Sequence, residues 1–127
     1  DYFKKLNDHY GHVQGDMALQ QVGQRLTELC RRPGDFVFRL GGEEFGIVIT
    51  DQSSSTGHGF AEIIRTEIEA LGIPNAGSEI ADHMTISGRI ITRIPAPEDT
   101  AGQFMKDADA RLYQAKAQGR NRVVSQE

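Results

Sequence analysis

The sequence is poor in cysteine, in long apolar runs and in positive charge. Its 127 residues include one cysteine, Cys30, so no disulfide can form within the chain and a reducing compartment is expected. No apolar run approaches the roughly 18 residues of a membrane-spanning helix, and no basic-then-apolar signal segment opens the sequence. The 14 basic residues against 18 acidic ones leave a net charge of −4, which argues against nucleic-acid binding through a basic face. We therefore expect a soluble, cytoplasmic domain with no nucleic-acid partner.

Apolar spacing predicts one domain of the α+β class, since this length suits a single core. Helical spacing is found in four segments: residues 1–10, 16–31, 60–71 and 104–115. Alternating apolar residues are found in four more: residues 36–40, 45–49, 84–90 and 123–124. The last helix is expected to bury one stripe: Phe104, Ala108, Leu112 and Ala115. We expect a mixed sheet, with an antiparallel hairpin at residues 36–49 and helices packed on its faces.

Three local signals refine this prediction. Asp16 is expected to cap the second helix, and residues 51–59, rich in serine and glycine, to form a polar loop. Gly88 is expected to mark a bulge in the third strand.

The turn Gly41-Gly42-Glu43-Glu44 is the first candidate site. Gly-Gly turns are common in hairpins, so a tight turn with a solvated acidic tip explains it simply. The functional alternative is that the glycines let backbone N–H groups approach a phosphate while the carboxylates hold a hard cation such as Mg²⁺. Such a metal would polarise a phosphoryl oxygen and help to deprotonate an attacking hydroxyl.

The first 16 residues form a second candidate. An amphipathic helix, a Gly turn and an Asp cap explain them structurally. Asn7 and Asp16 nevertheless offer the amide, carbonyl and carboxylate groups that pair with the N1–H and N2–H donors of guanine. Lys4 offers positive charge for a phosphate.

Two basic segments complete the candidates. The structural interpretation of residues 116–122 is that their positive charges complement the dipole at a helix C-terminus. The functional interpretation is that Lys116 and Arg120 bind the terminal phosphates of a nucleotide. Residues 32–35 form a turn with an exposed arginine, or part of a further site. Two histidines lack the spacing of metal ligands and are expected at the surface: His58 and His83.

Four segments in register resemble the GGDEF family of diguanylate cyclases: residues 1–8 (DYFKKLND), 11–16 (GHVQGD), 39–45 (RLGGEEF) and 108–122 (ADARLYQAKAQGRNR). The resemblance implies a palm-like, ferredoxin-like sheet of the nucleotidyl-cyclase type. It implies that two GTP molecules condense into cyclic di-GMP with release of pyrophosphate, using Mg²⁺ or Mn²⁺. In the family two domains face each other with one GTP each, so a homodimer is expected. A sensor or receiver domain is expected upstream, with membrane attachment left open.

The resemblance also implies roles for individual residues. Glu43 is implied as metal ligand and base, and Glu44 as a second group at the metal. Lys4 is implied as a third catalytic residue, which stabilises charge on the phosphates as the transition state forms. The implied substrate contacts are Asn7, His12, Asp16, Arg39, Gly41, Gly42, Lys116 and Arg120. Among them Asn7 and Asp16 would bind guanine, while Lys116 and Arg120 would hold the β and γ phosphates. Arg32 and Asp35 resemble the family's inhibitory site for cyclic di-GMP, with Arg65 as a candidate second arginine.

Two departures from the family pattern matter. The family has a metal-binding Asp two positions before the residue that matches Asp1, at the end of a central strand, and both lie outside residues 1–127. We therefore expect a GGDEF domain that lacks its first strand and helix, belongs to a longer chain and turns over little by itself. Arg89 stands where the family has glycine, so the surface nearby is expected to differ. The rival functions are a silent domain that binds GTP or cyclic di-GMP and a purely structural dimerisation module.

Overall fold

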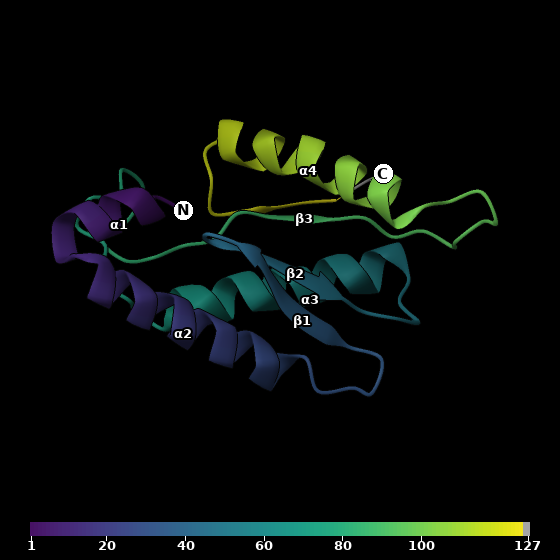
Figure 1. Cartoon of the computed structure of the whole chain (residues 1–127), viewed down its shortest axis with the longest axis horizontal. Coiled ribbons are helices and arrows are strands. Elements are labelled where there is room, and N and C mark those ends of the chain that lie inside the picture. Colours follow the sequence, from purple (N-terminus) through teal and green to yellow (C-terminus); the bar gives the residue numbers. More distant parts are fainter. Residues whose placement is uncertain (126–127) are drawn as a thin grey trace.

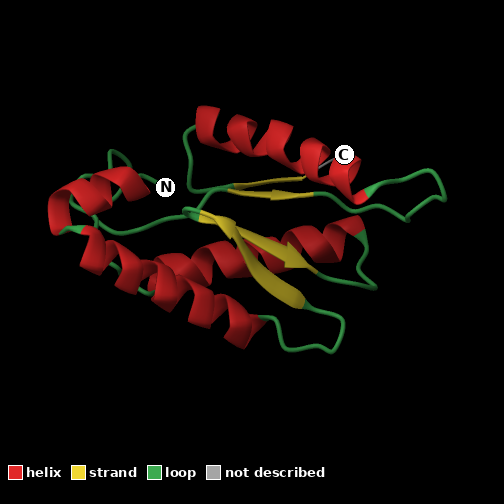
Figure 2. Cartoon of the chain, in the orientation of Figure 1, coloured by secondary structure: helices red, strands yellow, loops and turns green. Residues whose placement is uncertain are grey.

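The computed structural model describes residues 1–125 and has an α+β architecture (Figure 1, Figure 2). The elements follow one another as α1 (Phe3–Tyr10), α2 (His12–Leu29), β1 (Phe36–Gly41), β2 (Glu44–Val48), α3 (Ser54–Ala70), β3 (Gly88–Ile90), α4 (Ala101–Ala117) and β4 (Val123–Ser125). The predicted α+β class is confirmed.

The described strands form two pairs. β1 and β2 form the expected antiparallel hairpin, in which Phe36 pairs with Val48 and Gly41 with Glu44. β3 and β4 are parallel, and Gly88 pairs with Val123. Between residues 1 and 125 the two pairs are not joined into one sheet, so the expected mixed sheet is present as two separate halves.

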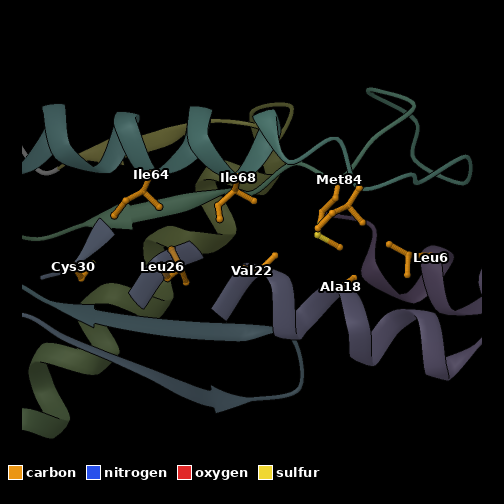
Figure 3. Close-up of a cluster of buried hydrophobic side chains, with 9 residues drawn as sticks. Leu6, Ala18, Val22, Leu26, Cys30, Ile64, Ile68 and Met84 are labelled. Atoms are coloured by element: carbon orange, nitrogen blue, oxygen red, sulfur yellow. The ribbon is translucent and has the colours of Figure 1, made fainter. Parts of the chain in front are cut away.

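The main hydrophobic core lies between α1, α2 and α3 (Figure 3). Leu6 of α1, Val22 and Leu26 of α2 and Ile68 of α3 are almost fully buried, and Met84 closes one end. The helical spacing of these residues is what predicts the three helices. The hairpin adds Phe45 and Ile47 to the edge of this cluster, so the strand that follows the turn is held against the core.

Three local predictions, two helix starts and one bulge, are wrong. α2 begins at His12 with Gly11 at the N-cap and no side-chain cap, so Asp16 lies inside the helix and does not cap it. α3 begins at Ser54, because the Ser53 hydroxyl accepts a hydrogen bond from the Thr56 N–H at 3.2 Å, so most of residues 51–59 is helical. Gly88 pairs in register and forms no bulge.

The buried stripe of α4 is confirmed only at its C-terminal end. Ala115 is fully buried, whereas Phe104 is 37% exposed. α4 covers the two short strands β3 and β4, which together present too little surface to bury the whole stripe. Because Ala115 lies directly before the segment 116–122, the best-packed part of α4 is next to the candidate phosphate-binding residues.

Candidate active site at the hairpin turn

The hairpin turn has the backbone that its sequence predicts. Gly41 and Gly42 have φ angles of +147° and +52°, in the region that favours glycine. A Cβ at either position would meet no atom within 4 Å, so the backbone angle and not crowding demands glycine. The Arg39 Nε donates to the Gly42 carbonyl at 2.8 Å and braces the turn from the preceding strand. The carboxylates that follow, on Glu43 and Glu44, are exposed to solvent.

Three segments that are distant in sequence meet beside Asp1. Figure 1 shows the N-terminus next to the tip of the β1–β2 hairpin and the turn between α4 and β4. The charged groups that act on the Asp1 backbone nitrogen include Glu43, Lys116 and Arg120. The acidic turn and the basic end of α4 therefore lie within electrostatic reach of one place, as the sequence predicts for a phosphate site.

The carboxylate of Asp1 links the N-terminal segment to residues 85–87 and to the turn between α4 and β4, which the sequence reasoning missed. It accepts hydrogen bonds from the Thr85 hydroxyl at 2.9 Å, the Ser87 hydroxyl at 2.6 Å and the Asn121 backbone N–H at 3.1 Å. Asn121 is held in the left-handed region, with φ +44°. The signal was present in the sequence, because a carboxylate at Asp1 and the hydroxyl pair of Thr85 and Ser87 are complementary. Their 84-residue separation concealed it.

Arg120 is positioned by an aromatic ring. Its Nη1 donates to the Tyr2 hydroxyl at 3.2 Å, and its guanidinium lies 4.3 Å from the centre of the Tyr2 ring. Lys116 is half-buried in the last turn of α4. Arg120 is thus oriented by Tyr2, and Lys116 by its position in the last turn of α4.

Asn7 presents an unsatisfied acceptor at the junction of α1 and α2. Its Oδ1 is buried and has no hydrogen-bond partner among residues 1–125. Gly15 makes room for this group, because a Cβ there would lie 1.7 Å from the Asn7 Oδ1. Buried polar atoms without partners are uncommon in folded proteins, so this one marks a place where a donor belongs. The guanine contact expected of Asn7 stays a prediction.

Three more of the predicted site residues lie on α1 and α2 near their junction. Lys4 precedes Asn7 by three residues on α1, so the two side chains lie on one face. His12 and Asp16 are four residues apart in the first turns of α2 and are both exposed.

A divalent metal fits the donors at the turn only in part. Within residues 1–125 there is no group of three or more His, Cys, Asp or Glu side chains that could hold a metal ion. Mg²⁺ is commonly bound by one or two carboxylates together with substrate phosphates and water. Glu43 and Glu44 are the residues that would supply that smaller protein share, and the remaining ligands would come from the substrate.

Arg32 and Asp35 form a preorganised pair away from the turn. The Arg32 Nη2 donates to Asp35 Oδ1 at 3.0 Å and to the Thr50 carbonyl at 2.9 Å. Hydrogen bonding to Arg32 lowers the pKa of the Asp35 carboxyl group. The pair lines a cavity of about 260 Å³ together with Leu29, Gln52 and Phe60. Arg65 does not line it, because its guanidinium bonds to Glu62, Glu69 and Asn121.

The two histidines expected at the surface are half-buried instead. His83 bonds to the exposed Asp82 at 2.8 Å and to Glu69 at 3.0 Å, and the bond to Glu69 holds its ring against α3. His58 has a buried Nδ1 without a partner among the described residues, because α3 begins earlier than predicted and turns that side chain towards β4.

Comparison with known proteins decides the family. The sequence profile described as "Diguanylate cyclase, GGDEF domain" matches residues 1–122. The chain belongs to the GGDEF family. Diguanylate cyclase VdcA of Vibrio cholerae serotype O1 is 38% identical over 125 residues, which are 98% of this chain and 36% of that protein. Diguanylate cyclase A of Treponema denticola is 35% identical over 124 residues, 98% of this chain and 32% of that protein.

Solved structures agree on the fold. The GGDEF domain of DgcB from Caulobacter crescentus, in complex with c-di-GMP, has a TM-score of 0.79 at 28% identity, covering 98% of this chain and 72% of that one. The active GGEEF domain of a diguanylate cyclase from Vibrio cholerae has a TM-score of 0.77 at 28% identity, covering all of this chain and 78% of that one. The palm-like fold is confirmed.

This GGDEF chain spans about a third of the length of those two cyclases. No helix in residues 1–125 is long and apolar enough to cross a membrane. The segment that the structure places at the hairpin tip is the same one that resembles the family motif, so sequence and geometry point to one site.

Proposed function

We propose that this chain is the catalytic domain of a diguanylate cyclase, which condenses two GTP molecules into cyclic di-GMP and two pyrophosphates. The observation that carries the proposal is the meeting of the Gly41–Glu44 turn with Lys116 and Arg120 beside Asp1. Acidic groups that can hold a cation and basic groups that can hold phosphate are both needed for phosphoryl transfer.

In this proposal the 3′-hydroxyl of each GTP attacks the α-phosphorus of the other. One P–O bond forms, the bond to the β-phosphate oxygen breaks, and pyrophosphate leaves. Glu43 accepts the hydroxyl proton, and Lys116 and Arg120 neutralise the charge that develops on the β and γ phosphates. Mg²⁺ or Mn²⁺, when held at Glu43 and Glu44, would polarise a phosphoryl oxygen. Each domain carries one GTP, so two copies of the domain must face each other.

Guanine specificity follows from the junction of α1 and α2. The unpartnered Oδ1 of Asn7 accepts from the guanine N1–H or N2–H, and the Asp16 carboxylate, on the exposed face of α2, accepts from the other donor. Adenine has no donor at N1, so it would leave the Asn7 acceptor unpaired at a cost of roughly 1–3 kcal/mol.

We further propose that the segment preceding Asp1 forms a strand beside β3. The Asp1 amino group donates to the Thr85 carbonyl at 2.8 Å, which is the type of bond that a neighbouring strand would continue. Such a strand would join the two separate strand pairs and bring a further family carboxylate close to Glu43. The residues present here would then turn over little GTP without that segment.

Product inhibition would occur at the pair Arg32–Asp35. The guanidinium is already oriented by the Asp35 carboxylate and faces a cavity, which suits binding of a cyclic dinucleotide. The DgcB domain that this chain resembles was solved with c-di-GMP, which supports the proposal. An upstream sensor or receiver domain would govern how two catalytic domains meet.

The direct test is turnover by a form extended upstream, incubated with GTP and Mg²⁺ and analysed for cyclic di-GMP. Glu43→Gln should abolish the product, while Glu98→Gln, an exposed carboxylate in the loop before α4, should leave it unchanged. The specific activity should rise with protein concentration, because two domains must meet. GTP binding without any cyclic di-GMP would instead favour the silent binding domain.

A further inference from the structure

A further candidate site is a groove between α4 and the β3–β4 pair. His58 of α3 also lines this groove. Its volume is about 590 Å³, within the range of roughly 300–1,000 Å³ typical of small-molecule sites. None of the residues proposed above to bind GTP or cyclic di-GMP lines this groove.

Two arginines face this groove without a carboxylate. The Nε and Nη2 of Arg89 are buried and have no hydrogen-bond partner within residues 1–125. Arg111 of α4 lines the same groove and is close enough to lower the pKa of Arg89, although burial of Arg89 has the larger effect. Neither arginine forms an ion pair with any described residue, and no Asp or Glu lines the groove in that part of the chain.

Several other arginines of this chain are held by carboxylates. Arg25 bonds to Glu28 and Glu67, Arg65 to Glu62 and Glu69, and Arg93 to Asp99 and Asp107. A chain with more acidic than basic residues can readily supply such partners. Buried donors without partners and adjacent like charges both destabilise the folded state, and an anion between the two guanidinium groups would relieve both effects.

The number of donors indicates which anion fits. Arg89 and Arg111 each present a guanidinium fork, and the carboxamides of Gln114 and Gln118 add further N–H groups. A single carboxylate offers about four acceptor positions on two oxygens, fewer than these groups can donate to. A phosphate group offers more oxygens in a tetrahedral arrangement, and arginine forks bind it in a bidentate manner.

We propose that the groove between Arg89 and Arg111 is a second anion site, which binds the phosphate group of a small phosphorylated ligand. Arg89 is the residue that stands where the family has glycine, so the site would be a property of this chain. The proposal is independent of the cyclase activity, because the groove shares no residue with the GTP or inhibitory sites.

The test is a titration of the protein with inorganic phosphate, and separately with pyrophosphate, at constant ionic strength maintained with chloride. The Arg89 Nε–Hε resonance, identified by its loss in Arg89→Gln, reports binding at this groove alone. We expect that resonance to shift on addition of phosphate. Arg111→Gln, which alters only a helix side chain, should weaken the binding roughly tenfold to a hundredfold. A greater shift with pyrophosphate would indicate a ligand with adjacent phosphates, and a greater shift with phosphate one with a single group.

Arg93→Gln is the matched control, because it removes an arginine four residues from Arg89 that already bonds to two carboxylates. It should bind phosphate as the unmodified protein does. The proposal is overturned when phosphate leaves the Arg89 resonance unmoved, when Arg111→Gln binds as tightly as before, or when Arg93→Gln loses as much affinity as Arg111→Gln. Where Arg89→Gln folds poorly, Arg89→Lys, which keeps the charge but lacks the Nε–Hε group, identifies the same resonance, so the Arg111→Gln result still tests the proposal.

Discussion

Replacing Gly15 by alanine should weaken guanine binding without lowering the free energy of unfolding. The new Cβ would lie 1.7 Å from Oδ1 and 2.9 Å from Cγ of Asn7, so that side chain must leave its present position. Alanine is favoured over glycine inside a helix by about 1 kcal/mol, which offsets the movement of the Asn7 side chain and a small shift of the Phe3 ring, whose Cζ lies 3.3 Å from the new Cβ. The variant should therefore fold about as stably as the parent, while the Asn7 acceptor no longer faces guanine.

The expected loss of GTP affinity follows from the unmade hydrogen bonds. Leaving guanine donors unpaired costs about 1–3 kcal/mol, which weakens GTP binding roughly fivefold to a hundredfold. Calorimetry with GTP on the upstream-extended protein measures the affinity, and urea unfolding measures the stability. Gly59→Ala is the matched control: it lies inside α3, and its Cβ would meet no atom within 4 Å. That variant should gain stability and bind GTP unchanged. Equal GTP affinity in the two variants would refute the assignment of Asn7 to guanine.

Two further predictions concern regulation and pH. Arg32→Ala should leave the initial turnover intact and raise the cyclic di-GMP concentration needed for inhibition at least tenfold, as measured from progress curves. The control is Arg31→Ala, which alters the exposed neighbouring residue and should change neither the turnover nor the inhibition. His83 has a raised pKa, first because of its hydrogen bond to Glu69, so the stability it contributes is complete below its unfolded value of 6.5 and is lost as pH rises through the higher folded value. Urea unfolding from pH 6 to 8 should therefore show a decline that His83→Gln flattens and that His9→Gln retains.

Each of these two predictions has a result that would contradict it. An unchanged inhibition curve for Arg32→Ala would remove the inhibitory role of the Arg32–Asp35 pair. A pH profile for His83→Gln that overlays the parent would show that the contacts of His83 with Glu69 and Asp82 contribute no measurable stability.

Local patterns predicted most of the fold, because the apolar spacing within each core helix is enough to predict that helix. Leu6, Val22 and Ile68 lie on regular apolar stripes, and the Gly41–Gly42 turn lies between two alternating runs. The start of α3 was wrong because glycines at positions 57 and 59 suggest a loop. Packing overrides that preference: Gly57 is buried, and a Cβ there would lie 2.9 Å from the Ile90 side chain.

Parts of the site depend on contacts that no local pattern can reveal. Asp1 meets Thr85 and Ser87 across more than 80 residues, and their pairing exists only once β3 lies beside the N-terminus. The orphaned Oδ1 of Asn7 depends on the missing side chain of Gly15, eight residues later. Arg89 stood out in sequence as a departure from the family, but its lack of a partner is a property of the folded chain.

The central claim is that the acidic turn lies against the triphosphate of GTP with a divalent metal between them. Paramagnetic broadening by Mn²⁺ tests it most directly, in the upstream-extended protein with a non-reactive GTP analogue. We predict selective broadening of the backbone amide resonances of Gly41 and Gly42 and of the analogue's phosphorus signals, both abolished by Glu43→Gln, while the Gly59 resonance stays sharp. Broadening that spares the turn, or that persists unchanged in Glu43→Gln, would contradict the account.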